Sequence, residues 1–175
     1  MPPYAELEVT TNFSFLRSAS HPAEMAKTAA ALDLSAVAVA DRNTLAGVVR
    51  AHQAAKQAGI KLVVGARLDL QDAPSLLCFP TDRAAYGRLS KLITLGRRRA
   101  AKGECELYLE DVFAHSGGQL FISLPPQESR GDARGNSGGN SRGDIGADTG
   151  AAPDAAYTAH LRHLREVFGR DVWIA

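Results

Sequence analysis

The chain opens with the stretch Tyr4-Ala-Glu-Leu-Glu-Val-Thr-Thr-Asn-Phe-Ser-Phe-Leu-Arg-Ser-Ala-Ser-His-Pro22. Residues 5–10 alternate weakly between apolar and polar side chains, which is typical of a strand. A polar turn follows, and residues 20–24 have the composition of a helix start, with a proline in the first turn. We therefore expect a strand, a turn and then a helix that runs to about residue 32.

The alternation of strands and helices continues along the chain. Residues 35–40 and 60–64 are short apolar runs, typical of strands covered on both faces. Helices are expected over 45–58, where Thr44 can cap the first turn, and over 82–95, which ends at Gly96. The remaining expected elements are strands at 66–71, 75–79, 119–124 and 171–175, a short strand edge and helix within 106–115, and a helix at 155–168. This order indicates parallel strands joined by right-handed crossovers, in an α/β sheet or barrel.

Size and composition describe an ordinary globular chain. Its 175 residues are enough for one domain with a core, and 45% are hydrophobic. The formal net charge of +1 provides no global attraction to nucleic acid, and no apolar run reaches the ~18–20 residues of a membrane span, so no membrane partner is expected. Cys78 and Cys105 lack the spacing of a metal or redox motif. Two free thiols are suited to a reducing cytoplasm.

Residues 127–154 differ in composition from the rest. They are rich in Gly, Ser, Asp and Arg and contain no aromatic residue. Such a segment cannot bury enough apolar surface to offset its chain entropy, so we expect a disordered insert. The predicted organisation is a first part at 1–126, the insert at 127–154, and a continuation of the same domain at 155–175.

Four segments carry a family resemblance: residues 4–22, 38–56, 59–68, and 80–99 together with 102–105. In this order they resemble the PHP domain (polymerase and histidinol phosphatase), and in particular the form found at the N-terminus of bacterial error-prone C-family DNA polymerases, which are similar to the alpha subunit of DNA polymerase III. The resemblance implies a distorted α/β barrel of seven strands. Because the chain ends soon after residue 171, we expect a barrel that is incomplete on its C-terminal side, as in a truncated piece.

The resemblance also implies where metal ligands would lie. In PHP domains histidines and carboxylates at the carboxyl ends of the strands hold divalent ions. The matching positions in this chain are Glu8, Thr10, Asn12, Asp41, Arg42 and Arg67. Of these positions only Asp41 matches the family pattern, and Glu8 offers a substitute carboxylate. Arginine keeps its proton and would repel a metal ion.

From this mapping we expect no catalytic residue, no bound metal and no cofactor in this chain. The prediction for the former metal pocket is an ion-pair cluster that joins Glu8 and Asp41 to Arg42 and Arg67. Taken alone, Asp41 after an apolar strand fits either a chemical role or an aspartate that stabilises a turn.

One basic run stands out. Arg97-Arg98-Arg99 with Lys102 follows the expected helix over 82–95, and it could contact DNA or a partner protein. Cations at a helix C-terminus are also favoured by the helix dipole, so a purely structural explanation is available as well.

The resemblance implies that the chain is the N-terminal PHP domain, or a fragment of it, of an error-prone polymerase that acts in DNA-templated DNA synthesis and damage tolerance. Its own role would then be structural support or partner docking. Its partners would be the remaining polymerase domains, DNA through them, and other replication or damage-tolerance proteins. Polymerisation would need Mg²⁺ in a separate catalytic domain, and no palm, fingers or thumb segment is present. Two alternatives remain: a stand-alone metal-dependent phosphoesterase, and an inactive truncated gene product.

Overall fold

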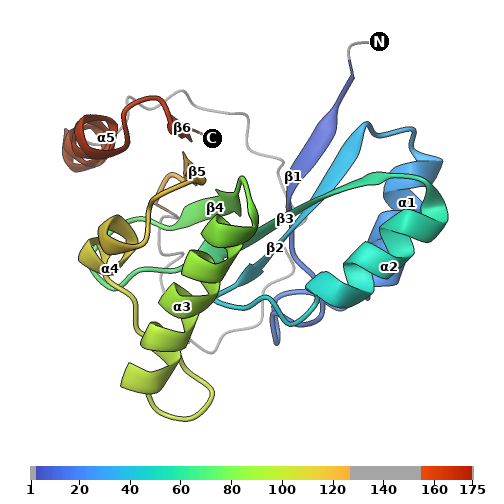
Figure 1. Cartoon of the computed structure of the whole chain (residues 1–175), viewed down its shortest axis with the longest axis horizontal. Coiled ribbons are helices and arrows are strands. Elements are labelled where there is room, and N and C mark those ends of the chain that lie inside the picture. Colours follow the sequence, from blue (N-terminus) through green and yellow to red (C-terminus); the bar gives the residue numbers. More distant parts are fainter. Residues whose placement is uncertain (1–2, 127–154, 175) are drawn as a thin grey trace, which may run out of the picture.

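The computed structural model describes residues 3–126 and 155–174, which form a curled sheet covered by helices (Figure 1). The six strands lie in the order in which they occur in the chain, from β1 to β6. They are β1 Ala5–Val9, β2 Ala36–Arg42, β3 Lys61–Leu68, β4 Leu76–Pro80, β5 Gln119–Ser123 and β6 Val172–Ile174. The helices are α1 Pro22–Ala31, α2 Val48–Ala58, α3 Arg83–Arg99, α4 Leu109–Ala114 and α5 Ala155–Phe168.

This arrangement confirms the predicted α/β fold as a six-stranded half-barrel. The pairs β1–β2, β2–β3 and β5–β6 are parallel, as expected. The expectation of a wholly parallel sheet is wrong for β4, which pairs antiparallel with both β3 and β5. The cause is the connection over residues 69–75, which contains no helix, because a strand can return beside its neighbour in parallel only through a long crossover.

Two strand predictions need correction around β3. The strand does not stop before Gly65 but continues to Leu68, so the separate strand expected at 66–71 is the last part of β3. Gly65 is accommodated inside the strand because it faces an aromatic ring. A Cβ at this position would lie 2.5 Å from Cδ1 of Phe79 on β4. The missing side chain therefore permits close packing and does not end the strand.

Two helix predictions also change. The helix expected from residue 45 begins at Val48 with Gly47 as its N-cap, and the Thr44 hydroxyl accepts a hydrogen bond from the Ala46 N–H in the preceding turn. α3 continues past Gly96 to Arg99. The absence of a side chain at Gly96 lets residues 105–107 pack against the helix, since a Cβ there would lie 2.7 Å from Sγ of Cys105. The short strand edge expected within 106–115 is absent from the described secondary structure, and α4 occupies that region.

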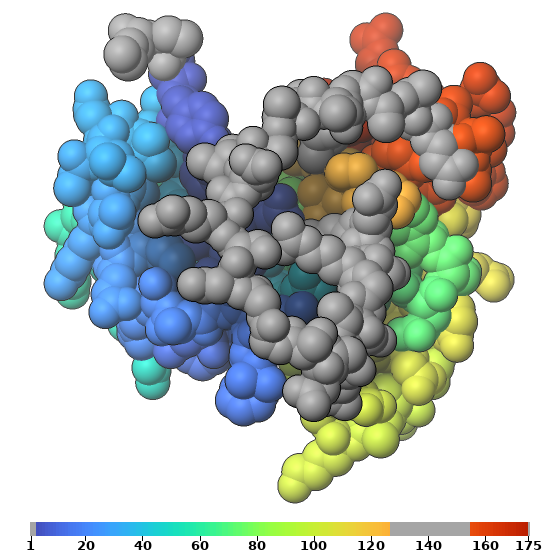
Figure 2. Space-filling model, turned by 180° about the vertical axis from the view of Figure 1, so that it is seen from behind, coloured from blue at the N-terminus to red at the C-terminus, as the bar shows by residue number. Residues whose placement is uncertain are grey.

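Two groups of helices cover different parts of the sheet. α1 and α2 pack beside β1–β3, and their core is built largely from alanine together with Val37 and Ile60. α3, α4 and α5 enclose a larger core that includes Leu89, Leu107 and Phe121. Viewed from behind, the blue and cyan N-terminal part and the red α5 lie on opposite sides of the molecule (Figure 2).

The predicted insert at 127–154 lies outside the described residues, and the division of the chain at 126 and 155 stays a prediction. Among the helices that the structure describes, none has the length and apolar character needed to cross a lipid bilayer. Both cysteines are free thiols, with Cys78 buried and Cys105 partly buried.

Candidate functional site at the carboxyl ends of β1, β2 and β3

The parallel strands β1, β2 and β3 bring their carboxyl ends to one edge of the sheet. β2 ends with Asp41 and Arg42, and β3 has Arg67 just before its last residue. In the β2–β3 register Arg42 is paired with Arg67. Glu8 lies near the end of β1, next in the sheet. The fold thus gathers four of the residues mapped from the sequence, although they are up to 59 positions apart.

Asp41 is held by the turn that follows β1. Its carboxylate is 1% exposed and accepts three hydrogen bonds. The backbone N–H of Thr11 and the hydroxyl of Ser14 each donate to Oδ1 over 2.8 Å, and the Thr11 hydroxyl donates to Oδ2 over 2.7 Å. A Cβ on Gly47 would lie 3.0 Å from Oδ2, so α2 closes the remaining side. Of the two roles open for Asp41, this geometry corresponds to the turn-stabilising one.

Arg67 extends its guanidinium between two carboxylates. Nη1 donates to Oε1 of Glu8 and Nε donates to Oδ1 of Asp69, each over 2.9 Å. Nη2 donates to the Ser75 hydroxyl over 3.3 Å. The Arg67 side chain is only 10% exposed, which makes these ion pairs stronger than pairs in full contact with water. The cation is therefore an integral part of this sheet edge.

Asp69 completes the network. Its Oδ2 pairs with Nη1 of Arg42 over 2.8 Å, and its Oδ1 accepts from Arg67 and from the Ser75 hydroxyl. Burial alone raises the pKa of Asp69, but hydrogen bonds from Ser75 and Arg67 and the charges of both arginines outweigh it. The pKa of Asp69 consequently lies below its ordinary value. The backbone is fixed as well, because the Asp69 N–H donates to the side-chain carbonyl of Asn43 over 3.1 Å.

These contacts correct the predicted four-residue cluster. The pair of Glu8 with Arg67 is present, but Asp41 forms no ion pair among the described residues, and Arg42 pairs with Asp69 instead. Asp41 does not join these ion pairs because both of its carboxylate oxygens already accept hydrogen bonds from the turn that follows β1. Thr10 and Asn12 follow β1 nearby, and their side chains have no hydrogen bond within the described parts of the chain.

Sequence reasoning missed Asp69, Thr11, Ser14 and Ser75. A signal for Asp69 existed, because it follows the buried end of β3 just as Asp41 ends the apolar run of β2. The predicted strand over 66–71 includes Asp69, so the sequence analysis does not place Asp69 at a strand end, where a site residue would be expected. No sequence pattern identifies Thr11 and Ser14, since their role depends on how the turn folds over β2.

The basic run, which comprises the last turn of α3 and Lys102, divides into paired and unpaired residues. Arg97 donates from Nη2 to the Asn43 carbonyl over 3.0 Å. Arg99 makes a two-pronged ion pair with Asp111, at 2.7 and 3.0 Å, and its hydrogen bond is the main reason that the pKa of Asp111 is lowered. Arg98 and Lys102 are exposed and have no hydrogen-bond partner in the described residues. A DNA or partner contact by this run stays a prediction.

A known protein family matches most of this chain. The profile of the PHP domain matches residues 6–173. The chain belongs to the PHP family. An error-prone DNA polymerase of Caulobacter vibrioides is 59% identical to this PHP chain over 127 residues, which cover 72% of the chain and 12% of the polymerase. Error-prone DNA polymerase 2 of Agrobacterium fabrum is 45% identical over 172 residues, which cover 98% of the chain and 14% of that polymerase.

The match thus lies within a small N-terminal part of these polymerases, and the chain spans about an eighth of their length. Among solved structures, a proposed metal-dependent phosphoesterase from Bifidobacterium adolescentis aligns with a TM-score of 0.59 at 17% identity. The alignment covers 74% of this chain and 70% of that one. At this identity the likeness establishes the PHP-type fold alone.

Proposed function

We propose that this chain is the N-terminal PHP domain of an error-prone DNA polymerase and that it serves the polymerase as a structural domain. The high identity to polymerases of which it covers about an eighth supports the first part. The parent activity would be DNA-templated DNA synthesis during damage tolerance, in the cytoplasm. The partners of this domain would then be the remaining polymerase domains, which carry the Mg²⁺-dependent nucleotidyl transfer.

The carboxyl edge of β1–β3 supports a structural role through one observation: the guanidinium of Arg67 lies between the carboxylates of Glu8 and Asp69. A divalent cation does not fit these residues. It would have to displace or approach a fixed positive charge, and both oxygens of Asp41 are already hydrogen-bonded. Within the described residues no three His, Cys, Asp or Glu side chains come together as a possible metal site. We therefore infer that ion pairs have replaced the metal centre implied by the family.

A phosphatase assay tests whether the chain lacks metal-dependent hydrolysis of phosphate esters. The purified chain is incubated with p-nitrophenyl phosphate in the presence of Mn²⁺, Zn²⁺ or a chelator. The proposal predicts the same background rate in all three conditions. Metal-dependent release of phosphate that the Asp41→Asn variant abolishes would favour the stand-alone phosphoesterase instead.

The size of the native polypeptide tests the membership in a polymerase. An antibody raised against the purified chain should detect a band several times larger than 18.6 kDa in extracts of the source cells. A band at 18.6 kDa would identify an independent product, and the structural role within a polymerase would have to be abandoned.

A further inference from the structure

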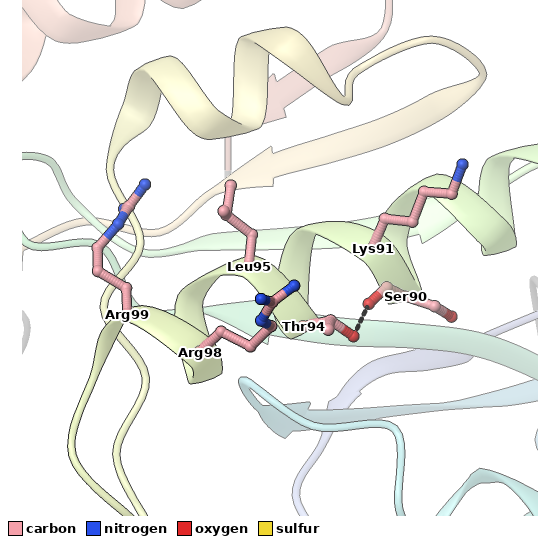
Figure 3. Close-up of a pocket in the computed structure, with 6 residues that line it drawn as sticks. All are labelled: Ser90, Lys91, Thr94, Leu95, Arg98 and Arg99. Carbon is pink, nitrogen blue, oxygen red and sulfur yellow. Dashed lines mark hydrogen bonds between the residues drawn. The ribbon is translucent and has the colours of Figure 1, made fainter.

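The outer face of α3 carries an unusual concentration of positive charge. Its seventeen residues, RAAYGRLSKLITLGRRR, include six of the twenty Lys and Arg residues of the chain and no Asp or Glu. An open hollow of ≈ 680 Å³ lies on this face. Figure 3 shows the side chains that line it: Ser90, Lys91, Thr94, Leu95, Arg98 and Arg99.

Internal contacts account for three of the six cations, and a fourth, Arg83, is the first residue of α3 and is not among the residues that line the hollow. Arg88 donates to the Gly117 carbonyl over 2.6 Å, Arg97 to the Asn43 carbonyl, and Arg99 pairs with Asp111. Lys91 and Arg98 differ from them, because both are exposed and neither has an ion pair or hydrogen bond among the described residues. In Figure 3 the Arg98 side chain extends back along the helix in the direction of Thr94, whereas Arg99 points away.

The helix dipole explains only part of this pattern. Arg98 lies in the last turn of α3, where a cation is favoured, but Lys91 lies in the middle of the helix, beyond the reach of that effect. The two residues are seven positions apart, so they share one face and are separated by about 10.5 Å along the axis. At this separation their long side chains can contact different phosphates of a nucleic acid, in which charges recur about every 3.4 Å along each strand.

The two hydroxyl groups at the hollow are bonded within the helix. Thr94 donates to the Ser90 carbonyl over 2.7 Å, and Ser90 donates to the Tyr86 carbonyl over 2.9 Å. Both hydroxyl hydrogens are therefore already engaged, so Lys91 and Arg98 are left to contact phosphate oxygens at the hollow. No aromatic ring lines the hollow, so the stacking platforms typical of single-strand binding are missing from it.

We propose that the outer face of α3 binds the phosphate backbone of duplex DNA through Lys91 and Arg98, independently of base sequence. The binding goes beyond the structural role proposed above and does not depend on the state of the β1–β3 site. It also changes the expectation from sequence, which assigned the contact to the whole run of Arg97, Arg98, Arg99 and Lys102. Arg97 and Arg99 support the fold, and Lys91 joins Arg98 in the contact.

The test measures binding of the 175-residue chain to a fluorescently labelled duplex by anisotropy at several salt concentrations. The K91E/R98E double variant should bind about tenfold more weakly at about 50 mM salt. The slope of log affinity against log salt should become less steep by about two, one for each lost phosphate contact. The K91A/R98A variant, which adds no negative charge, should show the same change in slope with a smaller loss of affinity.

The matched control is K27E/K56E, which introduces the same charge change on α1 and α2. Lys27 lies within a helix like Lys91, and Lys56 lies in a last helical turn like Arg98. The control should retain the parent affinity, and thermal unfolding followed by circular dichroism should show that every variant is folded. Four results would each overturn the proposal. The first two are an equal loss of affinity in K91E/R98E and K27E/K56E, and a slope of log affinity against log salt that does not change in K91E/R98E. The other two are tighter binding of the parent chain to a single strand than to a duplex, and no binding of the parent chain to the duplex at low salt.

Discussion

Arg42 and Arg67 occupy paired positions on the neighbouring parallel strands β2 and β3, and the carboxylate of Asp69 bonds to both of them. Two guanidinium groups on adjacent strands would repel each other without this bridge, because like charges directly opposite one another are unfavourable. Asp69 and Glu8 therefore balance the positive charge at the sheet edge. Removing a member of this network should therefore lower the stability of the fold.

Removal of the Arg67 guanidinium should destabilise the fold. In Arg67→Ala the carboxylates of Glu8 and Asp69 lose a shared partner, and we expect the free energy of unfolding to fall by about 1–3 kcal/mol. The value is below that of a fully buried pair because the Glu8 side chain is 41% exposed to water. Urea unfolding measures the change. Lys27→Ala, at an exposed position of α1, is the control, and an equal effect in both variants would contradict a specific role for Arg67.

Replacement of Asp41 should be more costly, although the new side chain has nearly the same shape. In Asp41→Asn an amide group replaces one carboxylate oxygen, so the bonds from Thr11 and Ser14 lose the charge of their acceptor, and the Thr11 hydroxyl must turn from donor to acceptor or lose its bond. We expect a loss of about 2–4 kcal/mol in urea unfolding. Asp33→Asn provides the control, since Asp33 is exposed with a φ of 56° that asparagine tolerates. A loss below 1 kcal/mol in Asp41→Asn would show that the turn does not depend on the carboxylate.

The lowered pKa of Asp69 predicts a specific acid sensitivity. A carboxyl group with a folded pKa below its unfolded value of about 3.9 stabilises the fold above that value, and its contribution is lost as the pH falls through the folded pKa. The stability difference between the parent chain and Asp69→Asn should therefore be full at pH 6 and shrink below about pH 4. Urea unfolding at pH 6 and pH 3 measures it. A difference that stays constant between the two pH values would rule out this assignment.

Two glycines of α3 should respond oppositely to the same substitution. Gly96→Ala places a methyl group 2.7 Å from Sγ of Cys105 and Cδ2 of Leu107, and we expect a loss of about 1–3 kcal/mol. Gly87→Ala meets no atom within 4 Å and should stabilise the helix by about 0.5–1 kcal/mol. The melting temperatures of both variants and of the parent chain, measured in the same buffer, give the direction of each effect. A stabilising Gly96→Ala would mean that residues 105–107 do not pack against α3 as described.

Much of the fold could be predicted from local patterns in the sequence. The order of strand, turn and helix over residues 4–31 follows from alternation, a helix-start proline and the capping pair of His21 and Glu24, which the structure contains. The bounds of α5 were also predicted, because the surrounding composition changes sharply there. Errors occurred where packing overrode local signals, as at Gly65 and Gly96, where an absent side chain permits a close contact and does not end the element.

The candidate site was predictable only in part, because contacts between distant segments of the chain determine several of its bonds. The pair of Glu8 and Arg67 could be expected because opposite charges replace ligands at neighbouring positions of a known family pattern. The hydrogen-bond partners of Asp41 could not be predicted, because Thr11 and Ser14 contact it only once the turn after β1 has folded against the end of β2. The antiparallel direction of β4 likewise depends on the short connection after Asp69, which sequence reasoning had assigned partly to a strand.

The metal content of the purified chain tests the central claim most directly. The protein is produced without an affinity tag in medium supplemented with zinc and manganese, dialysed, and analysed by inductively coupled plasma mass spectrometry. An ion-paired sheet edge at Glu8, Arg67 and Asp69 predicts far less than one metal ion per chain. One or more ions per chain, lost in the Asp41→Asn variant, would show that the site retains a metal centre and would contradict the account.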